Sequence, residues 1–172
     1  MNKLLALHPK QWNLLIVPGQ YRHRLLVAMA HLAAGNSLIV LDCGRQFDSS
    51  MVARAARGRP EIIDRIKVQR AFICYEAVRL LAKTPKGRTP ILVLDFLSTF
   101  YDENVRIHTR KFLLESSIRH FQRLSQGAGL AVTIHPPSSH DDLYLLQRLR
   151  SAAASVSVYE TPAPDSRQLS LF

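Results

Sequence analysis

The chain has 172 residues, a length that suits one compact domain with a sizeable core. No apolar run is long enough to cross a membrane, so we expect no membrane partner. The apolar stretch at residues 1–7 is broken at His8, too early for a signal peptide, which predicts a cytoplasmic location. The net charge of +10 favours a polyanion such as nucleic acid, and hence the nucleoid, although a merely solvated basic surface is the alternative.

Short segments rich in Ile, Leu and Val alternate with helical patterns along the chain. The predicted strands are Asn13 to Val17, Ser37 to Leu41, Ile66 to Val68, Pro90 to Leu94, Leu130 to Ile134 and Val156 to Tyr159. The predicted helices are Arg22 to Ala34, Ser49 to Arg57, Ala71 to Lys83, Val105 to Gln126 and Asp141 to Arg150. Because buried strands separated by helices require parallel crossovers, the pattern predicts an α/β fold with a doubly wound, mostly parallel sheet and helices on both faces.

The sequence shows neither an internal repeat nor a second hydrophobic core, so residues 1–160 are predicted to form one domain. Residues 161–167, Thr-Pro-Ala-Pro-Asp-Ser-Arg, have the composition of a flexible linker. They lead to a separate pentapeptide at residues 168–172.

The sequence gives little support for a metal-binding site or for a catalytic nucleophile. Cys43 and Cys74 lack metal-ligand spacing and are expected to be buried, reduced thiols. Asp141 and Asp142 have the pattern of an N-cap and a first-turn acid. The histidines lack metal-site spacing, and we expect surface or DNA-proximal positions for His108, His120, His135 and His140. We therefore predict no metal site and no catalytic residue.

Several segments resemble the core of the RecA/RadA recombinases. Residues 93–101, the long helix after them and residues 124–133 are similar to the second half of that core. Residues 41–48 resemble the segment after its second strand, and residues 66–72 its strand that runs into an Arg-Ala-Phe helix start. The similarity spans residues 12–135 in matching order and implies a RecA-like fold of the P-loop type.

The resemblance also implies a degenerate phosphate-binding (Walker A) loop. Matching residues 18–19 to the family's loop places Tyr21 at its last glycine, Arg22 at its lysine and His23 at its Ser/Thr. A tyrosine disfavours the close backbone approach that phosphate requires, and histidine is a poor magnesium ligand. Gly44 stands where the family has the glutamate that activates water, and Ile-His-Pro-Pro at 134–137 replaces its phosphate-sensing Asn-Gln.

The resemblance therefore implies a vestigial cofactor site at Gly19, Arg22 and Asp95, in a domain that does not hydrolyse ATP. Because arginine binds phosphate well, ATP binding without turnover stays open. The alternative is a RecA-superfamily ATPase that uses Arg22 in place of the lysine.

In the same family the segments after the fourth and fifth strands face DNA. The corresponding residues here, which imply contacts with single- or double-stranded DNA, are Tyr101, Arg106, Arg110 and Lys111. Tyr101 would stack on a base while the cations contact phosphates, and packing of Tyr101 within the domain is the alternative.

The last five residues, Gln168, Leu169, Ser170, Leu171 and Phe172, resemble the peptide by which bacterial polymerases and repair factors bind the replication sliding clamp. Folding of this segment as an edge strand is the alternative. The resemblances together imply a non-catalytic RecA-like accessory protein of DNA repair, recombination or replication, similar to accessory subunits of translesion synthesis. Its partners would be the clamp, DNA, and a translesion polymerase or RecA-like subunit. A pure protein adaptor that never contacts DNA is the second alternative.

Overall fold

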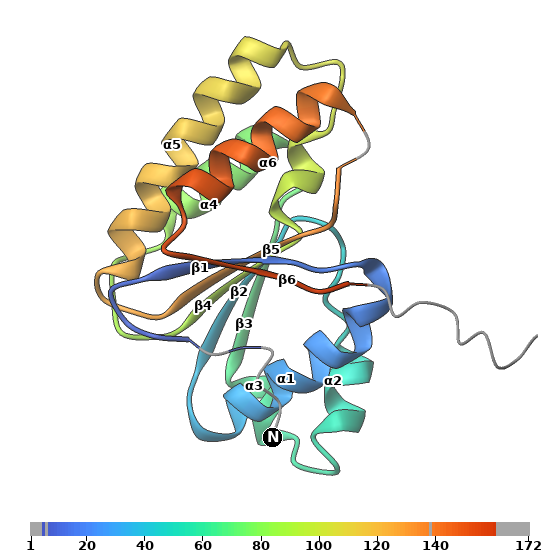
Figure 1. Cartoon of the computed structure of the whole chain (residues 1–172). Helices are drawn as coiled ribbons and strands as arrows, with labels where there is room; N and C mark the ends of the chain where they lie inside the picture. Colours follow the sequence, from blue (N-terminus) through green and yellow to red (C-terminus); the bar gives the residue numbers. More distant parts are fainter. Residues whose placement is uncertain (1–4, 6, 138, 161–172) are drawn as a thin grey trace, which may run out of the picture.

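A single parallel sheet forms the centre of the structure, a computed structural model that describes residues 5, 7–137 and 139–160 (Figure 1). Its strands lie in the order β3-β2-β4-β5-β1-β6. The strands are β1 (Trp12–Ile16), β2 (Leu38–Asp42), β3 (Ile66–Arg70), β4 (Ile91–Leu94), β5 (Leu130–Ile134) and β6 (Ser155–Val158). The α-helices are α1 (Arg22–Gly35), α2 (Ser49–Ala55), α3 (Glu61–Asp64), α4 (Cys74–Lys83), α5 (Ile107–Ser125) and α6 (His140–Ala152). Two 3₁₀ segments are η1 (Gly19–Tyr21) and η2 (Phe96–Phe100).

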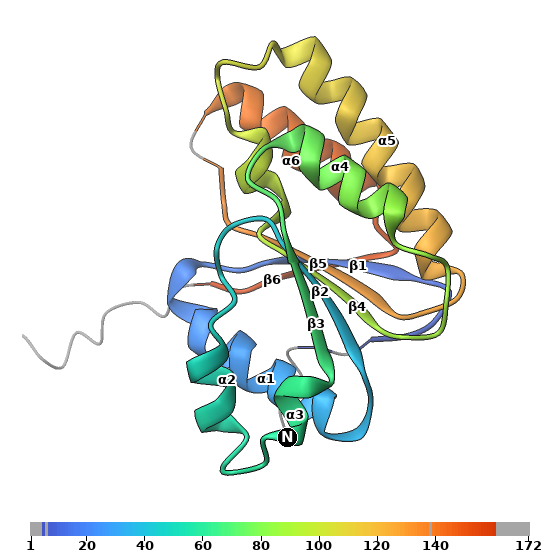
Figure 2. The same cartoon turned by 180° about the vertical axis from the view of Figure 1, so that it is seen from behind.

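The helices cover both faces of the sheet (Figures 1 and 2). Helices α1, α2 and α3 lie on one face, and α4, α5 and α6 on the other. Strand β1 shows why, because its side chains alternate between the two cores: Leu14 and Ile16 enter the α4–α6 core, whereas Leu15 enters the α1–α3 core. The α/β prediction is therefore confirmed, and each pair of neighbouring strands in the sheet is parallel.

The predicted elements differ from the observed ones mainly at their ends. Helix α4 begins at Cys74, three residues after the predicted start at Ala71. The backbone N–H of Ala71 instead donates to Asp42 and extends the pairing of β3 with β2, while the Glu76 carboxylate accepts from the N–H of Phe72. Helix α3 was not predicted because its four residues are too few to show a helical period.

Both cysteines are buried and free, as predicted. Burial raises the pKa of the Cys43 thiol far above its ordinary value, and the nearby carboxylates of Asp42 and Asp95 raise it further. Among the residues that the structure describes, no helix is long and apolar enough to pass through a lipid bilayer.

Arg110 lies inside the protein, where it joins α5 to the segments around it. Only 4% of the residue is exposed. Its guanidinium donates to the carbonyls of Phe100 (3.1 Å) and Val105 (2.9 Å) and lies 3.5 Å from the carboxylate of Asp142. This corrects the expectation that Arg110 contacts DNA, because its donors already serve acceptors inside the domain. Asp141 and Asp142 lie in the first turn of α6, and the N-cap is Ser139, not Asp141.

We predict that Arg110→Met destabilises the domain by about 3 kcal/mol, because it leaves Asp142 uncompensated and two carbonyls without a donor. Urea unfolding followed by circular dichroism measures the change. Arg106→Met is the matched control, since Arg106 is exposed at the start of α5, and should change stability little. Equal stability of the two variants would contradict a structural role for Arg110.

Candidate functional site

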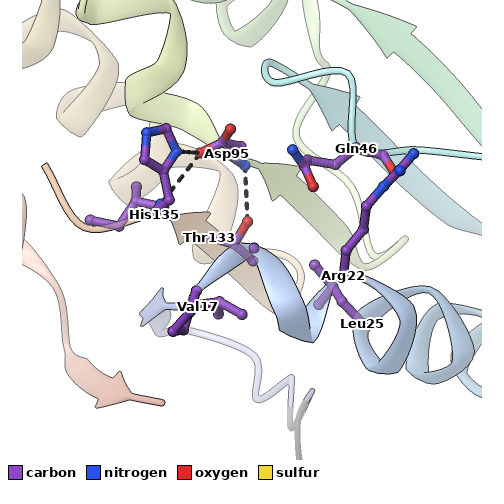
Figure 3. A pocket seen from close by; sticks show the side chains of 10 residues that line it. Val17, Arg22, Leu25, Gln46, Asp95, Thr133 and His135 are labelled. Atoms are coloured by element: carbon purple, nitrogen blue, oxygen red, sulfur yellow. Dashed lines mark hydrogen bonds and ion pairs between the residues drawn. The ribbon is translucent and has the colours of Figure 1, made fainter. Parts of the chain in front are cut away.

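A cavity of about 350 Å³ opens at the carboxyl edge of the sheet, where β1, β4 and β5 end beside the start of α1 (Figure 3). Its lining residues come from four segments distant in sequence: Val17, Pro18, Gly19, Arg22, Leu25, Gln46, Asp95, Thr133, Ile134 and His135. The carboxyl edge is where open α/β sheets bind ligands. The structure thus brings together Gly19, Arg22 and Asp95, which the resemblance assigned to a vestigial cofactor site.

Asp95 and His135 form the polar centre of this cavity. The Nδ1 atom of His135 lies 2.5 Å from Oδ1 of Asp95, which also accepts the backbone N–H of His135 at 3.3 Å. The hydrogen bond to Asp95 is the main reason that the pKa of His135 lies above its ordinary value, and partial burial opposes it. We had expected His135 on the surface or near DNA, but it is half-buried and bound to a carboxylate.

The orientation of Asp95 depends on an unusual backbone conformation. Its φ of 51° lies in the left-handed region, which asparagine and aspartate tolerate better than other non-glycine residues. The backbone N–H of Asp95 donates to the buried hydroxyl of Thr133 at 2.9 Å, which links β4 to β5 at this point. Thr133 was not singled out in the sequence, and neither was its role in fixing Asp95.

Gly44 lies against Asp95 and leaves no space for a side chain. A Cβ added at Gly44 would overlap the carboxylate of Asp95, with its Cβ 2.5 Å and its Cγ 2.6 Å away. Real Cβ atoms do not approach other atoms so closely. The position matched to the family's catalytic glutamate is therefore filled by a different carboxylate, from the end of β4.

A buried carboxylate holds the loop that carries Gly44. Asp42, 1% exposed at the end of β2, accepts the backbone N–H groups of Gly44, Gln46 and Phe47. Arg70 lies 3.5 Å from it and balances its charge. Because the loop is fixed in this way, Gly44 cannot easily move away from Asp95.

The connection between β1 and α1 is short and compact. The N–H of Tyr21 donates to the carbonyl of Pro18, which closes a 3₁₀ turn immediately before α1. The Tyr21 hydroxyl donates to the carbonyl of Glu160, and its ring packs against Tyr159 beyond β6. Arg22 enters the cavity region and donates from Nε to the carbonyl of Gln46 at 2.9 Å (Figure 3).

The residues expected to contact DNA differ in their exposure to solvent. Tyr101 donates to the carbonyl of His135 and packs edge-on against its ring, and burial raises the pKa of Tyr101 well above its ordinary value. Arg106 is exposed, and the Nζ of Lys111 lies 3.9 Å from the centre of the Tyr144 ring. With Arg110 buried, Arg106 and Lys111 remain candidates for phosphate contacts.

The expectations about a metal site and about the C-terminal pentapeptide depend on which residues the structure describes. Within residues 5, 7–137 and 139–160, no cluster of three or more histidine, cysteine or acidic residues could hold a metal ion. The linker and the clamp-like pentapeptide, residues 161–172, lie outside the described residues.

Comparison with known proteins identifies the fold. No family model matches the chain, and no curated protein matches it in sequence. The crystal structure of the RadB recombinase resembles it with a TM-score of 0.64 and 13% sequence identity, over 92% of this chain and 79% of that one. The protein therefore has a RecA-like, doubly wound α/β fold.

The pair formed by Asp95 and His135 predicts a pH-dependent stability. Because its pKa is raised in the folded state, His135 stabilises the fold fully below the pKa of the unfolded chain, about 6.5, and this contribution is lost as pH rises through the higher folded value. His135→Gln should therefore lower the melting temperature most at acidic pH. Thermal melts from about pH 5.5 to 8.5 measure this difference.

The matched control for this experiment is His140→Gln, because His140 is exposed at the start of α6. It should leave the pH profile unchanged. A constant difference between His135→Gln and the wild type across the whole range would show that the histidine contributes packing alone.

Proposed function

We propose that this protein is a RecA-like accessory factor of DNA repair, recombination or replication that does not hydrolyse ATP. The observation that carries the proposal is the contact between Gly44 and Asp95. The position of the family's general base holds no side chain, and the neighbouring carboxylate prevents one from fitting there. The likeness of the fold to a recombinase supports the assignment to DNA transactions.

The geometry around the cavity supports the loss of hydrolysis in further ways. Asp95, at the position that would hold magnesium through water in P-loop enzymes, is hydrogen-bonded to His135. Tyr21 stands where the family's loop has its last glycine, and a residue with a side chain disfavours the close backbone approach that phosphate requires. His23 is exposed on α1 and is not among the residues that line the cavity.

A second candidate function is favoured by the cavity itself. Gly19, Arg22 and Asp95 line one space, and the guanidinium of Arg22 would attract an anion. On this alternative the protein binds a nucleotide, either without turnover or as an ATPase that uses Arg22 in place of lysine. Measurements of nucleotide binding and hydrolysis separate these possibilities.

We predict no ATP hydrolysis above background, with or without DNA. Loss of a general base alone removes roughly two to four orders of magnitude in rate. Phosphate release by the purified full chain measures this, beside an active RecA-like ATPase as the positive control. DNA-stimulated hydrolysis that disappears in Arg22→Ala would establish the ATPase alternative.

DNA binding and clamp recruitment complete the proposed role. Arg106 and Lys111, on the segment after β4, would contribute weak, salt-dependent phosphate contacts. Residues 168–172 would recruit the domain to the sliding clamp, on a tether of average span about 5 to 6 Å times the square root of its length. A translesion polymerase or a RecA-like subunit is the expected further partner, and a pure adaptor role is the remaining alternative.

The clamp proposal predicts that Leu171→Ala with Phe172→Ala eliminates binding to a bacterial sliding clamp, because these side chains would fill a pocket on it. The expected wild-type affinity is micromolar in order, since ordering a short peptide offsets part of the burial. Calorimetric titration against purified clamp measures both proteins.

Pro162→Ala with Pro164→Ala, in the linker, is the control and should keep binding. The melting temperature of the domain should stay the same in both variants. A double variant of Leu171 and Phe172 that melts well below the wild type and still binds the clamp would identify the segment as a structural strand.

A further inference from the structure

A second cavity lies between α1 and α2, on the face of the sheet opposite α4, α5 and α6. It has a volume of about 640 Å³, within the range of ligand-binding pockets in proteins. Its lining residues are His23, Val27, His31, Met51, Arg54, Ala55 and Arg57, and we call it the α1–α2 groove. It shares no lining residue with the cavity at Asp95.

The groove is formed by regular helix faces. His23, Val27 and His31 are spaced by four residues and therefore lie along one face of α1. Met51 and Ala55 have the same spacing on α2. Each helix turns other residues, such as Met29 and Val52, into the core, whereas the groove faces carry exposed residues in the described part of the chain.

The chemistry of the groove divides into floor and rim. Val27, Met51 and Ala55 are half-buried and apolar. The remaining four lining residues are histidine or arginine, all exposed, and none of the lining residues is acidic. Among the described residues, neither Arg54 nor Arg57 forms an ion pair, so their charge is not balanced within this part of the chain.

The apolar floor and the polar rim together indicate which kind of ligand fits the groove. An apolar floor gains free energy only when apolar side chains cover it, and a phosphate backbone alone would leave it exposed to water. The arginines on the α2 side of the rim favour carboxylates next to those apolar side chains. Methionine in the floor adapts to ligands of different shape. An amphipathic helix with an apolar stripe and acidic flanks satisfies each of these conditions in the helix-in-groove mode.

We propose that the α1–α2 groove binds an acidic amphipathic helix of a partner protein. The apolar stripe of that helix lies on Val27, Met51 and Ala55, and its Asp and Glu residues pair with Arg54, Arg57 and the histidines of α1. The groove shares no lining residue with the cavity at Asp95, and residues 168–172, the proposed clamp peptide, are a different segment of the sequence. It therefore gives the protein a further partner that neither of those sites requires.

The test uses a displayed library of helical peptides of about 14 residues, roughly four turns, selected on the full chain. We expect the selected peptides to carry acidic residues on both sides of an apolar stripe. The strongest binder is then synthesised with a fluorescent label and titrated by anisotropy. Arg54→Glu with Arg57→Glu should weaken its binding at least about tenfold, because like charges then face each other.

The matched control is Arg79→Glu with Arg150→Glu, which makes the same charge change at exposed positions on α4 and α6. It should leave the affinity within about twofold of the wild type, since it lies on the opposite face of the sheet. His31→Glu, on α1, provides a second variant of the groove should the double variant fold poorly.

Other occupants give distinguishable results, and each would overturn the proposal. Selected peptides without acidic excess, or equal binding to the wild type and the groove variants, would show that the groove does not recognise an acidic helix. A labelled single-stranded oligonucleotide that loses binding only in the groove variants would assign the groove to nucleic acid. Peptide binding that requires deletion of residues 161–172 would assign it to that segment, and wild-type self-association abolished in the groove variants would assign it to a second copy.

Discussion

The carboxylate of Asp95 is the constraint around which the carboxyl edge of the sheet is organised. A left-handed backbone costs a non-glycine residue about 1 to 2 kcal/mol, and hydrogen bonds to Thr133 and His135 offset that cost here. The resulting orientation directs the carboxylate at Gly44, so the loop after β2 tolerates only glycine at this point. Asp42 and Arg70 hold that loop in place from below. The ends of β4 and β5, the loop after β2 and the start of α1 therefore line the same cavity.

If the protein does not hydrolyse ATP, as proposed, this arrangement also explains how the RecA-like fold is kept. The hydrophobic cores on the two faces depend on alternating strand residues such as Leu14 and Leu15, not on the polar residues at the sheet edge. Polar positions at the edge can therefore change without loss of the two cores. In this structure Arg22 bonds to Gln46 and Asp95 to His135, so these side chains stabilise the edge of the sheet.

Most of the fold could be predicted from the sequence, because buried parallel strands are apolar runs with clear ends. Strand β5 was predicted with its observed bounds, whereas the four-residue α3 carries no periodic signal. The meeting of Gly19, Arg22 and Asp95 was also predictable, since the resemblance places them at the same edge. The bond between His135 and Asp95 was not, because it depends on a φ that no residue type specifies. The burial of Arg110 was not predicted, because its partner Asp142 is distant in the sequence and only the fold brings α6 against α5.

The two edge strands of the sheet differ in the polarity of their side chains. Edge strand β3 exposes Lys67, Gln69 and Arg70, and such side chains oppose pairing with a strand from another molecule. Edge strand β6, Ser155–Val158, contains only serine and valine, and Val158 is 52% exposed. Strand addition therefore meets its smallest electrostatic and desolvation barrier at β6. At high concentration the protein is accordingly expected to associate in one direction, outward from β6, while the β3 end stays closed to further strands.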